Sequence, residues 1–260
     1  MKIAISGKGG VGKTTLAGCL ARLLADRGQK VLAIDADPDS NLPSAIGVPA
    51  EKLAAVQPLA QLKDLVAERT GAKPGTFGGM FKLNPQVDDI PDVYGLDYNG
   101  IKLLTLGTVP LGGGGCLCPE STLLRVLMRH LIVRRGETVI IDMEAGLEHL
   151  ARGTTESMDA FVVVVEPGQR AIQTAHQIRR LATDLGVRQV YVVGNKVAGP
   201  ADQDTIEAGA APMPVLGHLM LRESIRESDR RGVSPYDLDP DLRDEIAAVY
   251  AALEKVAPER

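Results

Sequence analysis

Residues 7–15 combine glycines and polar side chains in a pattern that binds the phosphates of a nucleotide. The pattern is G-x-x-x-x-G-K-S/T, read as Gly7-Lys8-Gly9-Gly10-Val11-Gly12-Lys13-Thr14-Thr15. Its glycines allow backbone N–H groups to turn toward an anion, and a following helix adds the positive end of its dipole. Lys13 is placed to reach the β- and γ-phosphates, and the Thr14 hydroxyl to bind Mg²⁺. The pattern therefore predicts a nucleoside triphosphate site built from residues 9–15.

Two acidic segments are candidates to complete that site. Asp35 and Asp37 follow a short apolar strand expected at residues 30–34, and Asp142 ends another expected at residues 138–142. Open α/β sheets bind ligands at the carboxyl ends of their strands. These carboxylates are therefore expected beside the phosphate loop, where they can hold Mg²⁺ or its waters and orient the attacking water.

Cys116 and Cys118 form a candidate site for different chemistry. In an extended segment their spacing places both thiols on one side, where they can chelate one ion. Zinc prefers four ligands, so the others must come from solvent, other side chains or a second chain. A twofold dimer supplies four thiolates at once, suited to Zn²⁺ if tetrahedral and to Ni²⁺ or Cu if nearer square planar. The alternative is a pair of ordinary loop cysteines, while Cys19 is expected in the core of the protein.

An alternation of strands and helices is needed to bring these segments together. Strands are expected at residues 3–5, 30–34, 101–106, 138–142, 161–165, 189–194 and 213–217, and helices at residues 14–27, 51–70, 120–134, 169–185 and 242–256. This order predicts an α/β fold with a doubly wound, mostly parallel sheet and helices on both faces. We expect a single domain over residues 1–260, with a surface excursion at about 51–100. Its second half, residues 71–100, is rich in Gly, Pro, Asn and Asp and is expected to be a long loop.

Composition and charge argue against several classes of protein. The net charge of −4 argues against a protein held to nucleic acid by phosphate attraction, and the absence of Trp leaves no platform for stacking bases. No apolar run approaches the ~18 residues of a membrane helix. The phosphate loop begins at residue 7, which leaves no room for a signal peptide, and three cysteines fit a reducing compartment. We expect a cytoplasmic protein that binds no nucleic acid and inserts into no membrane.

The lysine directly after the first glycine of the loop points to a family. K-G-G-x-G-K-S/T resembles the deviant phosphate loop of the dimeric ATPases that include septum-site and plasmid-partition ATPases, nitrogenase iron protein and metal-centre maturation ATPases. The resemblance implies a homodimer in which Lys8 reaches the partner's nucleotide. It also implies hydrolysis of ATP to ADP, with Asp37 positioning the water and Asp142 sensing the γ-phosphate and Mg²⁺. The alternative interpretation is that Lys8 is an ordinary solvated lysine of a surface loop.

A second resemblance concerns the nucleotide base. Asn195-Lys196 resembles the base reader of GTPases, but Val197-Ala198 follows where an aspartate would bind guanine. ATP is therefore favoured over GTP. The family resemblance implies that the adenine pocket closes around Leu219 and Leu221.

The cysteine segment narrows the resemblance further. G-G-x-G-C-x-C-P-E, together with D-M-E-A-G at residues 142–146, resembles the carbon monoxide dehydrogenase accessory ATPases, which are nickel-insertion factors. Glu144 stands where septum-site and partition branches usually carry proline. The resemblance implies a metallochaperone for carbon monoxide dehydrogenase, closed as a dimer by ATP and Mg²⁺, with nickel or zinc held between subunits by Cys116 and Cys118. Two alternatives remain: an iron–sulfur cluster carrier ATPase, and a positioning or partition ATPase without metal cargo.

Overall fold

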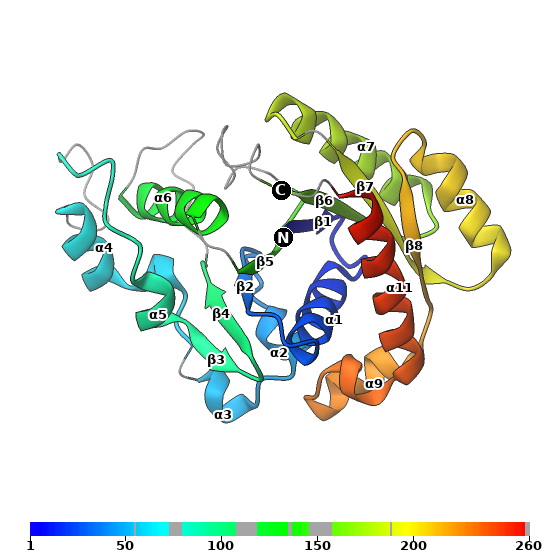
Figure 1. Cartoon of the computed structure of the whole chain (residues 1–260), viewed down its shortest axis with the longest axis horizontal. Helices are drawn as coiled ribbons and strands as arrows, with labels where there is room; N and C mark the ends of the chain where they lie inside the picture. Colours follow the sequence, from blue (N-terminus) through cyan, green and yellow to red (C-terminus); the bar gives the residue numbers. More distant parts are fainter. Residues whose placement is uncertain are drawn as a thin grey trace.

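The strands form a single twisted sheet (Figure 1). A computed structural model describes residues 1–54, 56–72, 80–107, 119–134, 137–145, 158–187 and 189–257, without the side chains of residues 133–134. Within these ranges the sheet has eight strands in the order β3-β4-β2-β5-β1-β6-β7-β8. The strands are β1 (Lys2–Gly7), β2 (Val31–Asp35), β3 (Leu96–Tyr98), β4 (Ile101–Thr105), β5 (Thr138–Asp142), β6 (Ala160–Val165), β7 (Val190–Val197) and β8 (Val215–Met220). Neighbouring strands are parallel except for the antiparallel pair β3–β4, which confirms the predicted doubly wound α/β fold.

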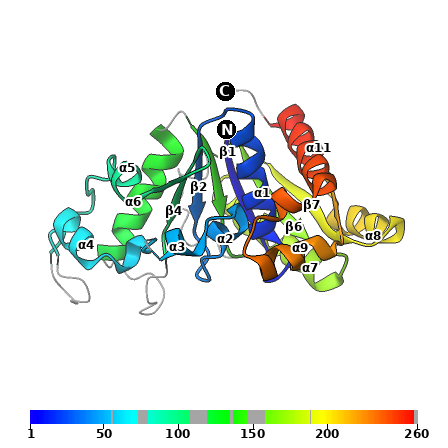
Figure 2. The ribbon, with the colours of Figure 1, turned by 90° about the horizontal axis from the view of Figure 1, so that it is seen from below.

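Helices cover both faces of this sheet. They are α1 (Lys13–Asp26), α2 (Leu42–Ile46), α3 (Ala50–Leu53), η1 (Leu59–Gln61), α4 (Lys63–Thr70), α5 (Ile90–Tyr94), α6 (Pro119–Arg134), α7 (Gln169–Asp184), α8 (Pro200–Ala210), α9 (Glu223–Arg231), α10 (Pro235–Leu238) and α11 (Pro240–Val256). Helices α1 and α11 pack on one face, and α6, α7 and α8 on the other (Figure 1). Seen from below, α2 lies beside the α9–α10 segment (Figure 2), where the Ser234 hydroxyl donates to the Ala45 carbonyl at 2.7 Å. No helix in the described ranges is long and apolar enough to cross a membrane.

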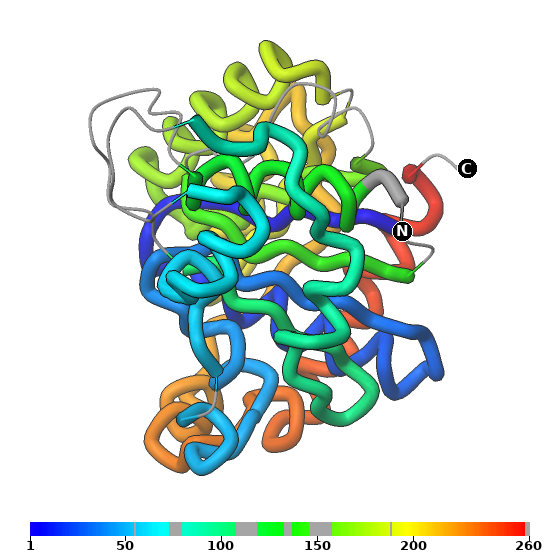
Figure 3. The backbone as a smooth tube through the Cα atoms, turned by 90° about the vertical axis from the view of Figure 1, so that its left-hand side faces the viewer, coloured from blue at the N-terminus to red at the C-terminus, as the bar shows by residue number. Residues whose placement is uncertain are grey.

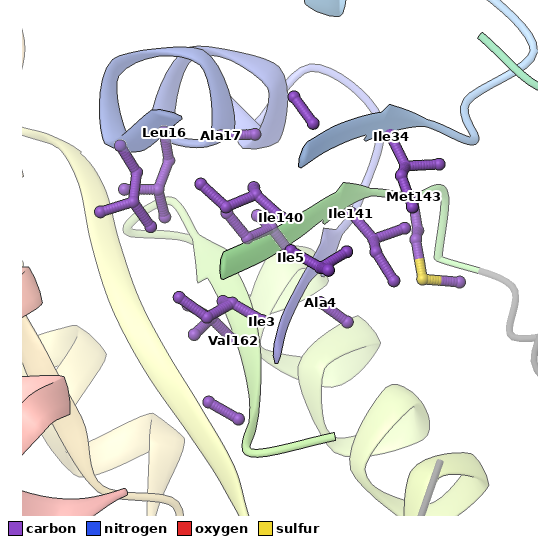
Figure 4. Close-up of a cluster of buried hydrophobic side chains, with 14 of the residues drawn as sticks. Ile3, Ala4, Ile5, Leu16, Ala17, Ile34, Ile140, Ile141, Met143 and Val162 are labelled. Carbon is purple, nitrogen blue, oxygen red and sulfur yellow. The ribbon is translucent and has the colours of Figure 1, made fainter. Parts of the chain in front are cut away.

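The central strands are apolar because both of their faces are covered. Ile3 of β1 pairs in register with Ile140 of β5, and both are fully buried. Side chains of β1, β5 and β6 pack with Leu16 and Ala17 of α1 in one continuous core (Figure 4). Burying each large aliphatic side chain stabilises the fold by roughly 1.5–3 kcal/mol. The loop that leaves β1 therefore starts from a rigid strand in the middle of the sheet.

Helix α1 begins and ends close to the predicted residues 14–27. Gly12 precedes it with a φ of 96°, and Gly28 follows it with a φ of 78°. Cys19 lies within α1 and is fully buried, which confirms the predicted core position. A side chain at Gly18 would lie 2.9 Å from the backbone of Ala45, so this glycine lets α2 pack directly against α1.

The segment at 51–100 contains more secondary structure than the sequence analysis predicted. Helix α5 and strand β3 lie in the part expected to be a loop. Asn99 and Gly100, with φ values of 47° and 77°, form a two-residue turn that pairs β3 with β4. Asn-Gly is typical of this turn, so the hairpin had a readable signal. Helix α4, which belongs to this segment, packs against α6 (Figure 3).

Two strands end later than predicted. Strand β7 continues to Val197, so Asn195 and Lys196 lie within it rather than after it. Its pairing with β8 shifts in register between Gly194 and Val197, where Lys196 has a φ of 57°. Strand β8 likewise continues to Met220, because Met220 pairs with Val197 beyond the shift. Pairing between distant segments, which local apolar patterns do not report, extends both strands.

Candidate nucleotide site

The phosphate loop joins the end of β1 to the start of α1. Gly10 and Gly12 have φ values of 80° and 96°, in the left-handed region that glycine adopts without strain. Such turns direct consecutive N–H groups toward a common point and create a site for an anion. A side chain at Gly12 would lie 2.1 Å from Nδ2 of Asn195, so close packing against β7 also requires glycine here.

A cavity of about 560 Å³ opens in front of this loop, at the carboxyl ends of the strands. Its lining residues are Gly7, Gly9, Gly10, Gly12, Lys13, Thr14, Asp37, Asp39, Asn41, Glu144 and Ala145. The cavity brings together most of the loop and Asp37, while Asp35 and Asp142 are not among its lining residues. Val11 is instead fully buried in the core, and Thr15 is half-buried outside the lining.

Asp35 is buried at the end of β2 and organises the loop that follows it. Its Oδ1 accepts the N–H of Asp37 at 3.2 Å, and its Oδ2 accepts the N–H of Leu42 at 3.1 Å. Burial and, to a smaller extent, the neighbouring Asp142 carboxylate raise the pKa of Asp35 to about 7. With both oxygens engaged, Asp35 shapes the path from β2 to α2.

Asp142 is the register partner of Asp35 on β5 and is equally buried. Both of its carboxylate oxygens lack a hydrogen-bond partner within the described part of the chain. Burial raises its pKa to about 6, while the nearby Thr14 hydroxyl and Lys13 ammonium act in the opposite direction. Buried polar atoms without partners are uncommon in folded proteins and call for a ligand or water. A hydrated Mg²⁺ fits this position, because magnesium prefers carboxylate and hydroxyl oxygens.

Lys13 and Asp37 face each other inside the cavity. The Lys13 Nζ lies 3.5 Å from Oδ2 of Asp37, and both side chains are nearly buried. Oδ1 of Asp37 accepts the N–H of Asp39 at 3.1 Å, which orients the carboxylate. A lysine in this position can neutralise phosphate charge, and an oriented carboxylate can accept a hydrogen bond from water.

Two lysines, Lys8 and Lys196, flank the carboxylate of Glu166 beside the phosphate loop. Glu166 was not among the residues predicted from the sequence. Lys8 Nζ lies 3.8 Å from one oxygen of Glu166, and Lys196 Nζ lies 3.2 Å from the other. Lys196 also donates to the carbonyl of Gly10 at 2.7 Å. Glu166 directly follows the apolar strand β6, as Asp35 and Asp142 stand at the ends of theirs, so its position was a readable signal.

The Asn195 side chain is hydrogen-bonded to the backbone of the phosphate loop. Its Nδ2 donates to the Val11 carbonyl at 2.7 Å, and its Oδ1 accepts the N–H of Lys196 at 2.8 Å. Leu219 lies within β8 and is buried, whereas Leu221 follows the end of this strand and is exposed. The assignment of these residues to an adenine pocket stays a prediction.

The cysteine pair lies outside the described residues, so the structure says nothing of Cys116 and Cys118. Within the described ranges, no group of three or more His, Cys, Asp or Glu side chains is arranged to hold a metal ion. Burial raises the pKa of the Cys19 thiol to about 12, so it remains a protonated core residue.

The central parallel sheet, the glycine loop that leads into α1 and the acidic strand ends together define a phosphate-loop nucleoside triphosphatase. Residues 2–236 match the family described as the CobQ/CobB/MinD/ParA nucleotide binding domain. The chain belongs to this family and is an ATPase.

Full-length relatives and solved structures agree with this assignment. The chain is 52% identical to the carbon monoxide dehydrogenase accessory protein CooC of Rhodospirillum rubrum, over 99% of this chain and 98% of that protein. It is 44% identical to an uncharacterized ATP-binding protein of Methanocaldococcus jannaschii, over 96% of each chain. The cell division protein MinD of Aquifex aeolicus shares the fold with a TM-score of 0.67 at 19% identity, over 99% of this chain and 98% of that one. A ParA family ATPase of Chlorobium tepidum has a TM-score of 0.68 at 18% identity, over 97% and 98% of the two chains.

Proposed function

We propose that this protein is a cytoplasmic, homodimeric ATPase that assists the insertion of nickel into carbon monoxide dehydrogenase. The observation that carries the proposal is the 52% identity, over nearly the whole chain, to an accessory protein of that enzyme. The client follows from the name of this relative. Nickel as the cargo is inferred from the resemblance of the Cys116-x-Cys118 segment to nickel-insertion ATPases.

The residues of the cavity have separate roles in this proposal. The N–H groups of residues 9–15 and the Lys13 ammonium bind the phosphates of ATP. Thr14 and Asp142 would hold Mg²⁺ and its waters, and the ion would supply positive charge to the transferring phosphoryl group. Asp37 accepts a hydrogen bond from the attacking water and aims its oxygen at the γ-phosphorus. Lys8 contacts the nucleotide of the partner subunit, so ATP binding closes the dimer and hydrolysis reopens it.

The cysteine pair connects this cycle to a metal. In a twofold dimer Cys116 and Cys118 of each subunit meet at the axis and provide four thiolates for one nickel or zinc ion. Metal that binds only the dimer must favour the dimer by mass action. Because thiolates bind metal only after losing their protons, binding weakens as the pH falls.

The test measures metal binding and mass together. Adding nickel or zinc to reduced, nucleotide-free protein should convert monomer to dimer in sedimentation experiments, with one ion per two chains at saturation. Changing Cys116 and Cys118 to serine should abolish both effects, while ATP still binds. Cys19→Ala is the matched control and should retain both effects, because Cys19 is buried in the core. One ion per monomer without a change in mass would refute the shared site.

Elemental analysis of the protein purified from metal-supplemented medium separates the alternative functions. Nickel or zinc at one ion per dimer supports the proposal. Iron with inorganic sulfide supports an iron–sulfur cluster carrier. Protein without metal, from cells that supply all three, supports a positioning or partition ATPase, whose fold this chain shares.

A further inference from the structure

Glu166 connects two cations that come from different parts of the chain. It directly follows β6, whose residue Val164 pairs in register with Gly7 at the start of the phosphate loop. This pairing places the Glu166 carboxylate beside the loop, with Oε1 3.8 Å from Lys8 Nζ and Oε2 3.2 Å from Lys196 Nζ. The contact between Glu166 and Lys8 is therefore a product of strand order rather than of sequence proximity.

The contact with Lys8 is exposed and easily exchanged. The Lys8 side chain retains 39% of its accessible surface and the Glu166 side chain retains 30%. Surface ion pairs of this kind change an equilibrium by roughly 1.5- to 5-fold. One ammonium group cannot pair closely with Glu166 and reach into the nucleotide site of another subunit at the same time. The two positions of Lys8 therefore compete.

Lys196 keeps the Glu166 carboxylate in an ion pair when Lys8 moves away. Its ammonium donates to the Gly10 carbonyl at 2.7 Å as well as to Glu166, so it is anchored to the loop. When Lys8 leaves, the Glu166 carboxylate keeps one cationic partner. Lys8 therefore has an ion-pair partner within its own subunit, and Glu166 remains paired with Lys196 when Lys8 leaves.

We propose that Glu166 is a positioning residue that holds Lys8 in its own subunit and is exchanged for the partner's nucleotide phosphates when the dimer closes. This inference rests on the proposed role of Lys8 in a nucleotide-dependent dimer. Because a symmetric dimer releases two lysines, Glu166 lowers the dimerisation constant by about 2- to 25-fold. It sets the concentration of ATP at which the subunits associate.

The experiment measures ATP-dependent dimerisation with a non-hydrolysable ATP analogue and Mg²⁺, followed by sedimentation. Glu166→Gln should raise the dimerisation constant by about 2- to 25-fold over the parent protein, and the increase should vanish as NaCl approaches 1 M. Glu68→Gln is the matched control, because Glu68 forms a surface ion pair with Arg69 at 3.3 Å on α4, outside the residues that line the cavity. This control should dimerise like the parent.

Two further variants identify the lysine through which Glu166 acts. In a Lys196→Ala background, Glu166→Gln should still raise the dimerisation constant, since Lys8 remains. The affinity of monomeric Lys8→Ala protein for ADP, with and without Glu166→Gln, measures the effect of the lost negative charge alone. This change in affinity should be smaller than the change in the dimerisation constant.

The outcomes separate this inference from the proposed function. If Lys8→Ala loses dimerisation while Glu166→Gln dimerises like the parent, Glu166 has no such role and the proposed dimer stands. An increase that disappears in the Lys196→Ala background also overturns the inference. If Lys8→Ala dimerises like the parent, both the proposed role of Lys8 and the inference fail.

Discussion

Asp35 and Asp142 occupy equivalent positions and have different partners. They end neighbouring parallel strands, pair with each other in register and are both fully buried. Asp35 accepts two backbone N–H groups, from Asp37 and Leu42. Both oxygens of Asp142 lack a partner within the described part of the chain. One carboxylate is committed to the protein, and the other is available to a ligand.

This difference shows that an acidic residue at a strand end has no single role. A carboxylate already saturated by backbone donors shapes a loop, whereas a buried carboxylate without donors is costly until it gains a cation. We therefore propose that Asp35 sets the geometry of the switch segment and that Asp142 binds Mg²⁺. Four predictions test it.

The largest effect is expected from Lys13→Ala, which removes the cation that lies between the two acidic segments. ATP hydrolysis should fall by about 1,000-fold or more, because phosphoryl transfer depends on positioned charge. Steady-state phosphate release at saturating ATP measures this. Lys30→Ala is the control and should retain activity, because exposed Lys30 lies before the amino end of β2. Normal turnover in Lys13→Ala would move the nucleotide site elsewhere.

The next largest effect is expected from Asp37→Ala. This change removes a carboxylate that lines the cavity in the segment whose backbone Asp35 holds. Hydrolysis should fall about 100-fold or more, while ATP still binds, because the proposed task of Asp37 is to orient the attacking water. The closed dimer should persist longer in sedimentation or crosslinking experiments. A loss of ATP affinity instead would show that Asp37 serves Mg²⁺, the role proposed for Asp142, and would remove the distinction between the two segments.

Asp142→Asn and Asp35→Asn compare the two residues directly. Titrating Mg²⁺ at fixed ATP should show a Mg²⁺ requirement raised by about tenfold or more in Asp142→Asn, since a neutral amide binds Mg²⁺ weakly. Asp35→Asn should keep the Mg²⁺ requirement of the parent protein, because its carboxylate is used by the backbone. Equal shifts in both variants would contradict the separate roles.

The smallest effect is on the stability of the nucleotide-free protein. The pKa of Asp142 is raised from 3.8 to about 6 by burial, so between these values the unfolded chain loses this proton while the folded one keeps it. The parent protein therefore loses stability as the pH rises through this window. Asp142→Asn should match the parent below pH 4 and exceed its free energy of unfolding by about 3 kcal/mol above pH 7.

Urea denaturation at several pH values measures this difference. For Asp35→Asn the difference should extend to higher pH, because the pKa of Asp35 is raised to about 7. Mg²⁺ with ATP should reduce the advantage of Asp142→Asn, because the parent's ionised Asp142 then gains a cation. A difference that is independent of pH would show that Asp142 is not buried as a costly charge.

Much of the fold and the site could be predicted because the signals are local. The loop at residues 7–15 is one continuous motif, and the apolar runs at β1, β2, β5 and β6 mark strands buried on both faces. The unpredicted hairpin at Asn99-Gly100 was also local and was overlooked. The predicted ends of β7 and β8 came too early, because pairing across the sheet extends both strands.

The sequence by itself determined the phosphate loop, the acidic strand ends and the α/β class, because each depends on residue type and spacing within a few residues. Only the tertiary structure decided which strands are neighbours. The strand order puts β1 between β5 and β6, and β2 beside β5. That order joins Asp35 to Asp142 and brings Glu166 to Lys8. Packing of helices on both faces selects the order, so no local pattern contains it.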